Sequence, residues 1–438
     1  LGTGSGITSD ANVTFKDEVT IAAGDTATTL NGNTTFDKAT LLTFTAGGNA
    51  TLGNAGTDEV TLASGPVTIT TATAGTNQVY HAKVDGSQDL TLAAGAGTIT
   101  FNAAVGGTNV IGDGTGAALT IQSGATTFGS TLGTGSGITS DANVTFKDEV
   151  TIAAGDIGST FNANVVLDGL TLDSANALSF GTAAGSDTVT LSGGAVRLQT
   201  TGNSGTLTVD GTITTVAGTT VTLSNAGTLT INANITADGA LLQNGAGTVA
   251  INGNRSITTT GDSVAFSAAV TVSGGSLTID TTNAGAIPTG AAVSFDAPVD
   301  GGGNKMTLNG GSNGDVSLAA DAFGVPDFII ANANNINLTS LSSSGTVEMD
   351  GQGLASLTGA LVSGGPVTLK VNDLDLPGTI NAGGSAVQIR PALVARSITV
   401  GGGGPGTLQL SSAELSRITT SGLLTVGDNA HAGGITIN

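Results

Sequence analysis

Residues 205–254 read GTLTVDGTITTVAGTTVTLSNAGTLTINANITADGALLQNGAGTVAINGN. In this stretch, triplets of apolar, polar and apolar residues alternate with turn-forming groups such as NAGT and NGN. That alternation is typical of short β-strands that bury one face and are joined by tight turns. Helical periodicity is weak throughout the chain, and its best example, SSAELSR at residues 411–417, is too short to predict a helix.

The strand triplets also recur at a longer interval of 20 or 21 residues. A chain of hairpins would place turns about every 8–12 residues and would not produce this interval. A solenoid does, because each coil returns the chain to the same face, about 4.8 Å further along. Crossovers between parallel strands favour right-handed winding. We therefore predict an all-β, right-handed parallel β-helix (β-solenoid) with about 20 residues per coil, about 22 coils and a length of roughly 100 Å. The interval separates Leu229 from Val249, Val316 from Ile336, Val347 from Val367, Val367 from Val387, Leu354 from Leu374, and Val387 from Leu408.

Each residue type has an expected place in such a coil. Val, Leu, Ile and the twelve Phe residues should stack inward as ladders, while Thr and Ser line the outside of the strands. Gly and Asn should take the left-handed backbone positions at the corners.

The chain also contains a long internal duplication. The sequence LGTGSGITSDANVTFKDEVTIAAGD occupies residues 1–25 and recurs without change at residues 132–156. Similarity continues with drift beyond this block, so we divide the chain into one repeat copy at 1–131, a second at 132–260, and diverged coils of the same rod at 261–438. Because the sequence starts at Leu rather than Met and on a repeat boundary, we expect a mature product or a segment of a longer chain.

Composition narrows the functional classes. The net charge is −21, and the eleven Lys and Arg residues are dispersed, which argues against nucleic-acid binding. The chain has no Cys, and therefore no disulfide, thiolate metal site or thiol nucleophile. No apolar run is long enough to predict a membrane span in this segment. Loose binding of calcium by carboxylates is the one cofactor that composition leaves open.

The repeats resemble those of a known class of bacterial surface protein. Residues 205–254 and DLTLAAGAGTITFNAAVGGTNV at residues 89–110 are similar to the repeats of filamentous-haemagglutinin and autotransporter-adhesin proteins. The resemblance covers most of the chain, in low-complexity coils rich in Gly, Thr and Asn. It implies a secreted, rod-shaped β-helix with a role in adhesion, matrix or surface filaments.

Some parallel β-helices cleave acidic polysaccharides, which requires clustered carboxylates and a nearby cation. The closest cationic pair is Arg390 and Arg396 in RPALVAR, and we interpret it as a solvated corner. Asp373 and Asp375 in NDLDL would point to one face of a strand, and we expect an exposed acidic pair. These residues do not assemble the groove of three or more carboxylates and a cation that an enzyme of this kind would need.

Other candidates are single residues or adjacent pairs. Asp17 and Glu18, repeated as Asp148 and Glu149, should face opposite ways on the surface. The only Tyr, Tyr80, precedes His81, which we place in a loop or corner. The other histidine, His431, is far away in the sequence, so the two have no metal-ligand spacing.

Three motifs are weaker still. GGSNGDVSL at residues 310–318 resembles the calcium-binding nonapeptide of β-rolls, but Asn313 and Ser317 depart from it, and it occurs once. The glycine-rich GTGSG and GGGGPG segments lack the features of a phosphate loop. The spacing of four T-x-T pairs argues against one ice-binding array. Those pairs are Thr188/Thr190, Thr206/Thr208, Thr220/Thr222 and Thr228/Thr230.

We therefore predict a non-enzymatic, secreted structural protein: a β-helical rod at the cell surface that acts as an adhesin or as a building block of a filament or matrix. We assign it no catalytic, cofactor-binding or metal-binding residue. The expected partner mode is end-to-end self-association or continuation of a longer chain, with a cell-surface or polysaccharide partner as a further candidate. The alternatives are a calcium-dependent lattice protein of the S-layer kind and a polysaccharide-active β-helix enzyme.

Overall fold

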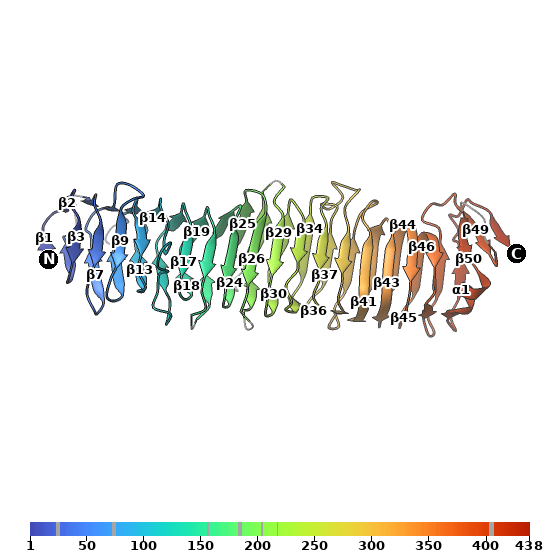
Figure 1. Ribbon diagram of the computed structural model, residues 1–438. Helices are drawn as coiled ribbons and strands as arrows, with labels where there is room; N and C mark the ends of the chain where they lie inside the picture. The colour runs from blue at the N-terminus through green and yellow to red at the C-terminus, as the bar shows by residue number, and fades with distance from the viewer. Residues whose placement is uncertain are drawn as a thin grey trace. The chain divides into compact units, whose positions relative to one another are not determined.

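A computed structural model describes residues 1–22, 27–71, 76–155, 157–182, 186–202, 205–216, 218–402 and 407–438. The chain forms a parallel β-solenoid of about 17 turns with about 22 residues per turn, and 51% of its residues lie in strands (Figure 1). The predicted all-β, parallel solenoid is confirmed. The coils are fewer and longer than predicted, because loops at the corners lengthen many of them. Coil length varies along the chain: Gly2 lies opposite Thr20, whereas Leu90 lies opposite the more distant Leu119.

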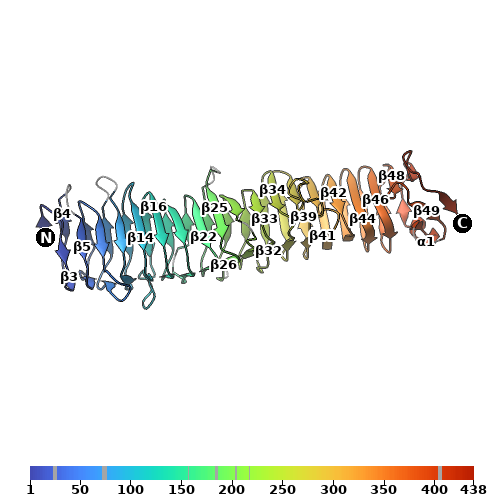
Figure 2. The same ribbon diagram turned by 90° about the horizontal axis from the view of Figure 1, so that it is seen from above.

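The chain divides into two compact units. The first comprises residues 1–219 and 224–229, and the second comprises residues 220–223 and 230–438. Within each unit the strands of successive coils lie side by side in both views (Figures 1 and 2). The repeat boundaries at 131/132 and 260/261 are defined by sequence similarity. The boundary between the two units is defined by the contacts within each unit, so it does not coincide with either of them.

Each coil of the first unit contributes three short strands, so most strands pair in parallel with the strand three positions later in the chain. The result is three stacks of strands, which we call A, B and C after the first, second and third strand of the chain. Stack A is seen in β4 (Val19–Ile21) on β7 (Leu42–Thr45), stack B in β5 (Thr28–Leu30) on β8 (Ala50–Leu52), and stack C in β6 (Thr34–Phe36) on β9 (Glu59–Leu62).

The two identical 25-residue blocks form the same strands but occupy different stacks. The first block forms β1 (Gly2–Thr3), β2 (Thr8–Ser9), β3 (Val13–Phe15) and β4, and the second forms β17 (Leu132–Thr134), β18 (Ile138–Ser140), β19 (Asn143–Phe146) and β20 (Val150–Ile152). Followed from β1, stack A passes through β4, β7, β10 (Val67–Thr70), β13 (Leu90–Ala93) and β15 (Leu119–Gln122) to β18. Stack A therefore holds the second strand of the second block, not the first.

The duplication period, which runs from Leu1 to Leu132, is thus one strand short of a whole number of coils. Every strand of the second block is displaced by one stack around the solenoid. An identical local sequence can therefore occupy different stacks, because the alternation of inward and outward side chains is the same in each stack.

The interior is filled by ladders of apolar side chains, as predicted. One aromatic column runs through stack B from β11 (Gln78–Tyr80) to β19. Its rings, those of Tyr80, Phe101, Phe128 and Phe146, have centroids 4.5, 4.9 and 5.3 Å apart. All four rings are buried. Such stacked contacts stabilise neighbouring coils beyond the burial of their area.

One phenylalanine contradicts the expectation that all twelve point inward. Phe323 is 44% exposed, on β41 (Val316–Val325). The pairing register of β41 shifts on both sides of Ala322, and Ala322 is the residue that points inward there. Because strand side chains alternate, Phe323 then points outward.

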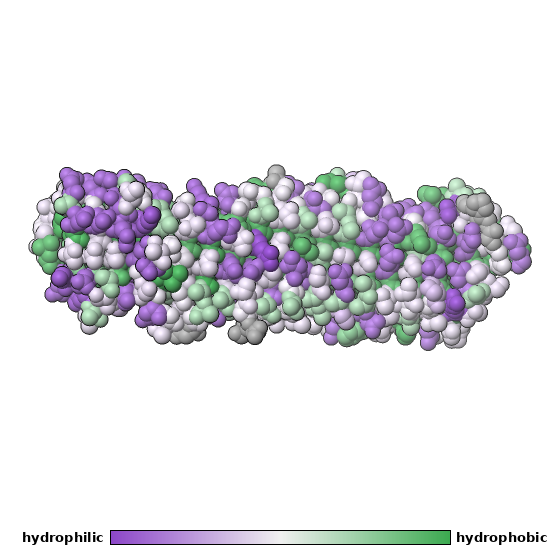
Figure 3. Space-filling view, viewed as in Figure 1, coloured by the Kyte–Doolittle hydropathy of each residue, from purple (hydrophilic) through white to green (hydrophobic). Residues whose placement is uncertain are grey.

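Threonine lines the outside of many strands, as predicted, but Thr28, Thr34 and Thr134 contradict the prediction, because they are buried and point inward. In stack A a single column of hydroxyl side chains continues in register over eight strands, and every member is partly exposed. These residues are Thr43, Thr68, Thr91, Thr120, Thr139, Thr160, Ser179 and Thr208. Seen from one side, hydrophilic residues gather most densely over the N-terminal coils of the first unit (Figure 3).

Asparagine plays a different part at the corners from the one predicted. Among the described residues, the non-glycine residues with positive φ are Asn283 and Ala284, and the remaining left-handed positions are glycines. Asparagine acts instead through its side chain, which accepts a backbone N–H one coil further along. The Oδ1 atom of Asn12 accepts the N–H of Asn33 at 3.1 Å, and that of Asn33 accepts the N–H of Glu59 at 3.0 Å.

The predicted 20-residue interval gives the register of the second unit in part. Val347 on β44 (Val347–Leu357) lies opposite Val367 on β46 (Val367–Asp375), which lies opposite Val387 on β48 (Val387–Arg390). Val316 likewise lies opposite Ile336.

Two predicted pairs are wrong. Leu374 lies opposite Ala355 rather than Leu354, because the register shifts after Gly351. Val387 lies opposite Leu424 rather than Leu408.

The chain leaves the coil after β48 and forms a separate small sheet. That sheet contains β49 (Ser397–Val400), β50 (Thr407–Leu410) and β53 (Ile435–Ile437). The short helix α1 (Ser412–Ser416) follows β50 and begins at a capping box between Ser411 and Glu414. No helix in the described part of the chain is long and apolar enough to cross a membrane.

Candidate functional site

A charged groove on the outer surface of the sheet is the strongest candidate site in the second unit. It has a volume of about 200 Å³ and crosses β42 (Phe328–Ala333), β44, β46 and β48. Outward side chains form its two walls, and backbone forms its floor. Its lining residues are Ile329, Ile330, Ala331, Glu348, Met349, Asp350, Thr368, Lys370 and Arg390.

The two walls follow from strand alternation. On β44 the buried Met349 points inward, so Glu348 and Asp350 both point outward on either side of it. Residues two apart on a strand are about 6.6 Å apart, and neighbouring strands are about 4.8 Å apart. One wall therefore contains Ile329, Glu348 and Thr368 in register. The other contains Asp350, Lys370 and Arg390 in register.

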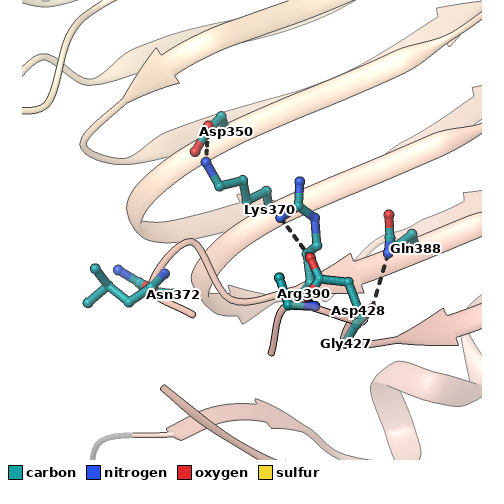
Figure 4. Close-up of polar contacts among 9 residues, drawn as sticks. Asp350, Lys370, Asn372, Gln388, Arg390, Gly427 and Asp428 are labelled. Atoms are coloured by element: carbon teal, nitrogen blue, oxygen red, sulfur yellow. Dashed lines mark hydrogen bonds and ion pairs between the residues drawn. The ribbon is translucent and has the colours of Figure 1, made fainter. Parts of the chain in front are cut away.

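Ion pairs tie the second wall together (Figure 4). The Nζ atom of Lys370 lies 2.5 Å from Oδ2 of Asp350, and an Nη atom of Arg390 lies 3.0 Å from Oδ2 of Asp428. All four side chains are about a quarter exposed. Lys370 and Arg390 are directly opposite each other, which would be unfavourable for two cations alone. An aspartate on each outer side offsets that repulsion.

Several polar groups of the groove keep unused bonding capacity. The Glu348 carboxylate is exposed and has no hydrogen bond or ion pair among the described residues. Lys370 uses one of its three N–H groups, and Arg390 uses one of its five. The Nε2 atom of Gln388, beside Arg390 on β48, donates to the Gly427 carbonyl at 3.1 Å (Figure 4).

The interpretation of Arg390 and Arg396 as a solvated corner is wrong for Arg390, which lies on β48 with its side chain about a quarter exposed. Arg390 binds Asp428, while Arg396 donates to the Thr407 carbonyl at 3.2 Å, so each arginine has its own partner. The signal that was missed is the regular spacing of Asp350, Lys370 and Arg390. It matches the coil length of this region and places the three side chains in one column.

Asp373 and Asp375 lie where the sequence predicted. Leu374 between them is buried, so both carboxyl groups are on the outer face of β46. Asp375 is exposed and accepts a hydrogen bond from Ser356 Oγ at 3.1 Å.

The prediction that Asp17 and Glu18 face opposite ways is wrong. They lie in the turn between β3 and β4, and both bind Lys38, at 3.0 and 2.8 Å. Hydrogen bonds from Lys38 lower the pKa of both carboxyl groups, and the two carboxylates, Glu18 first, raise the pKa of Lys38.

The second copy cannot repeat this cluster, because Gly169 occupies the position in the second copy that corresponds to Lys38 in the first. Glu149 instead accepts the backbone N–H of Thr171 at 3.2 Å. Asp148 accepts the N–H of Glu149 at 2.9 Å.

Tyr80 and His81 follow the simpler interpretation. Tyr80 is fully buried, and its hydroxyl donates to Oε1 of Gln78 at 2.8 Å. Burial raises the pKa of the Tyr80 phenol. His81 is at the corner after β11, with Nδ1 3.0 Å from the side-chain amide of Asn102. The ring nitrogens of His431 are buried without a hydrogen-bond partner in the described part of the chain.

In the segment at residues 310–318, which resembles a calcium-binding nonapeptide, the acidic residue Asp315 binds the corner of the next coil. Oδ1 of Asp315 accepts hydrogen bonds from the side chain of Asn334 at 2.9 Å and from the backbone and side chain of Asn335 at 3.0 Å. Among the described residues, no three His, Asp or Glu side chains form a cluster that could hold a metal ion.

The T-x-T pairs do not form one array, as their spacing indicated. Thr190 on β25 (Thr188–Ser192) lies in stack B, opposite Thr214. Thr208 on β27 (Leu207–Val209) lies in stack A, opposite Ser179.

No family model, curated protein or solved structure matches this chain. The fold itself defines the class, which is that of the parallel β-solenoids. The resemblance of the repeats to filamentous-haemagglutinin and autotransporter-adhesin proteins stays a prediction.

Proposed function

We propose that this chain is a non-enzymatic, extracellular structural protein whose coils act as a spacer, within a surface adhesin or within an extracellular filament or matrix. The observation that carries the proposal is the displacement of the second 25-residue block by one stack. This displacement bears on function because the strands recur in the second block while the stack on which each strand lies changes.

Duplication preserved the strands but not the face of the solenoid on which each strand lies. Thr14 on β3 belongs to stack C, whereas its counterpart Thr145 on β19 belongs to stack B. A protein that bound a partner through a repeated lateral array would need both copies on one face. A spacer needs only additional coils, because each coil is stabilised by its neighbours whichever stack its strands enter.

The charge and composition are consistent with an extracellular setting. A net charge of −21 on a chain with 10% charged residues favours solubility and opposes non-specific association with polyanions. The absence of Cys removes any dependence on the redox state of the compartment. The resemblance of the repeats to secreted adhesins points the same way.

The proposal can be tested by changing coil number and coil surface separately. Deleting residues 139–159 removes one whole coil, because Thr139 lies opposite Thr160 and Val144 lies opposite Val165. A deletion of residues 139–148 is the matched control, since it breaks the register. The variants would be displayed on a bacterial surface, and cell attachment and the height of a terminal epitope would be measured.

We expect the whole-coil deletion to fold, to lower the epitope by about 4.8 Å, and to change attachment less than the control does. Replacing the outward threonines of stack A with serine should leave attachment unchanged. Loss of attachment in the serine variant, with no effect of coil number, would show that a lateral face carries the function and that the spacer proposal is wrong. Calcium-dependent sheets in electron micrographs would instead favour the lattice alternative.

A further inference from the structure

We propose that the charged groove across β42, β44, β46 and β48 binds a short segment of a neutral polysaccharide. The proposal concerns the second unit alone and does not rest on the spacer function. It starts from the bonding capacity that the groove leaves unused.

The free groups of the groove match sugar hydroxyls, each of which can donate and accept. Glu348 offers a carboxylate that makes no other bond in the described part of the chain, and an exposed acceptor of this kind binds a hydroxyl donor strongly. Lys370 and Arg390 offer N–H groups beyond those used in their ion pairs. Thr368 lies between Glu348 and Gln388, in the wall that faces Lys370 and Arg390. Its hydroxyl group can both donate and accept a hydrogen bond.

The charge balance favours a neutral ligand over an acidic one. Asp350 neutralises Lys370, and Asp428 neutralises Arg390, so Glu348 leaves the groove with a net negative charge. The chain as a whole carries −21, which repels a polyanion at a distance. A cation is disfavoured as well, because Lys370 and Arg390 already occupy the space between Asp350 and Asp428 and are paired with them.

The shape of the groove suits a linear chain. It spans four strands of one stack, a distance of roughly 14 Å from β42 to β48. Ile329 and Ala331 form its β42 end and provide apolar contact for the C–H faces of a sugar ring. Ala331 is exposed and has a short side chain, so the groove is open at this end.

The test is affinity electrophoresis of the full chain in native gels that contain dextran, hydroxyethylcellulose or a mixed-linkage β-glucan, with polygalacturonate and alginate gels as the acidic arm. We expect retardation in at least one neutral gel and none in the acidic gels. E348Q, K370M and R390M should each weaken the retardation about tenfold, the size expected for a hydrogen bond to a charged group. K38M, which removes a cation of the first unit, should leave it unchanged.

E348Q separates a loss of binding from a loss of folding. Glu348 makes no hydrogen bond or ion pair among the described residues, and glutamine has the same shape, so the substitution should leave the fold intact. The melting curve of each variant by circular dichroism provides the check on folding. The proposal is wrong if the wild-type chain is not retarded by any neutral polysaccharide, if only the acidic gels retard it, or if K38M weakens retardation as much as E348Q. None of these outcomes would alter the spacer proposal.

Discussion

Ile7 and Ile138 provide a direct test of how much stability comes from stacking, because they occupy the same position in the two identical blocks. Their local sequence is the same from the start of each block to its end. Their surroundings differ. Ile138 is fully buried in β18, between β15 and β21 (Ser159–Phe161), whereas Ile7 is partly exposed and immediately precedes β2.

Truncation of each residue to alanine should therefore have unequal effects. Ile138→Ala removes a buried side chain from the core and should lower the free energy of unfolding by about 2–5 kcal/mol. Ile7→Ala removes the same atoms from a partly exposed site and should cost about 1 kcal/mol or less. Local propensity cannot contribute to the difference, since it is the same in both blocks.

Equilibrium urea unfolding would measure both variants. Far-ultraviolet circular dichroism follows the whole chain, while tyrosine fluorescence reports on the first unit, because Tyr80 is the only Tyr and the chain has no Trp. Equal shifts in the unfolding midpoint for the two variants would refute the reasoning, because they would mean that stability is set by local sequence rather than by the neighbouring coils.

Three further predictions concern single contacts. The Asp17–Glu18–Lys38 cluster should stabilise the fold above about pH 4.5 and lose this effect as the pH falls through the lowered carboxyl pKa values, or as it rises above the usual lysine pKa of about 10.5. The difference in thermal stability between wild type and K38M should therefore be present at about pH 7 and shrink as the pH falls below the usual carboxyl pKa values; a difference that does not shrink in acid would contradict this origin. Gly53→Ala should cost about 1–3 kcal/mol in urea unfolding, because Gly53 has a φ of 75° and an added Cβ would lie 2.5 Å from the Cβ of Ala82, and an unchanged midpoint would exclude that strain. Asn164→Ala should cost about 1 kcal/mol by the same assay, because its Oδ1 accepts the Thr188 N–H at 2.9 Å, whereas hydrogen exchange at Thr188 that does not accelerate would show that the corner bond is not formed.

The sequence alone determined the strands and the direction in which most of their side chains point. Period-2 alternation is a local property, so triplets such as Leu207-Thr208-Val209 indicate both the strand and its buried face. The constant interval between Val347, Val367 and Val387 also predicted their register, because the corners between these strands keep the same length from coil to coil.

Only the tertiary structure decided which residue lies above which where corner length varies. The placement of one block in two different sets of stacks, the binding of both Asp17 and Glu18 to Lys38, and the outward position of Phe323 all depend on the lengths of the intervening loops or on a local shift in register. Strand alternation does not encode these lengths. The groove could be predicted in part. The spacing of Asp350, Lys370 and Arg390 is visible in the sequence. The position of the exposed Glu348 beside them and the ion pair between Arg390 and Asp428 depend on coil packing, since the chain forms β49 and β50 in a separate sheet before it reaches Asp428.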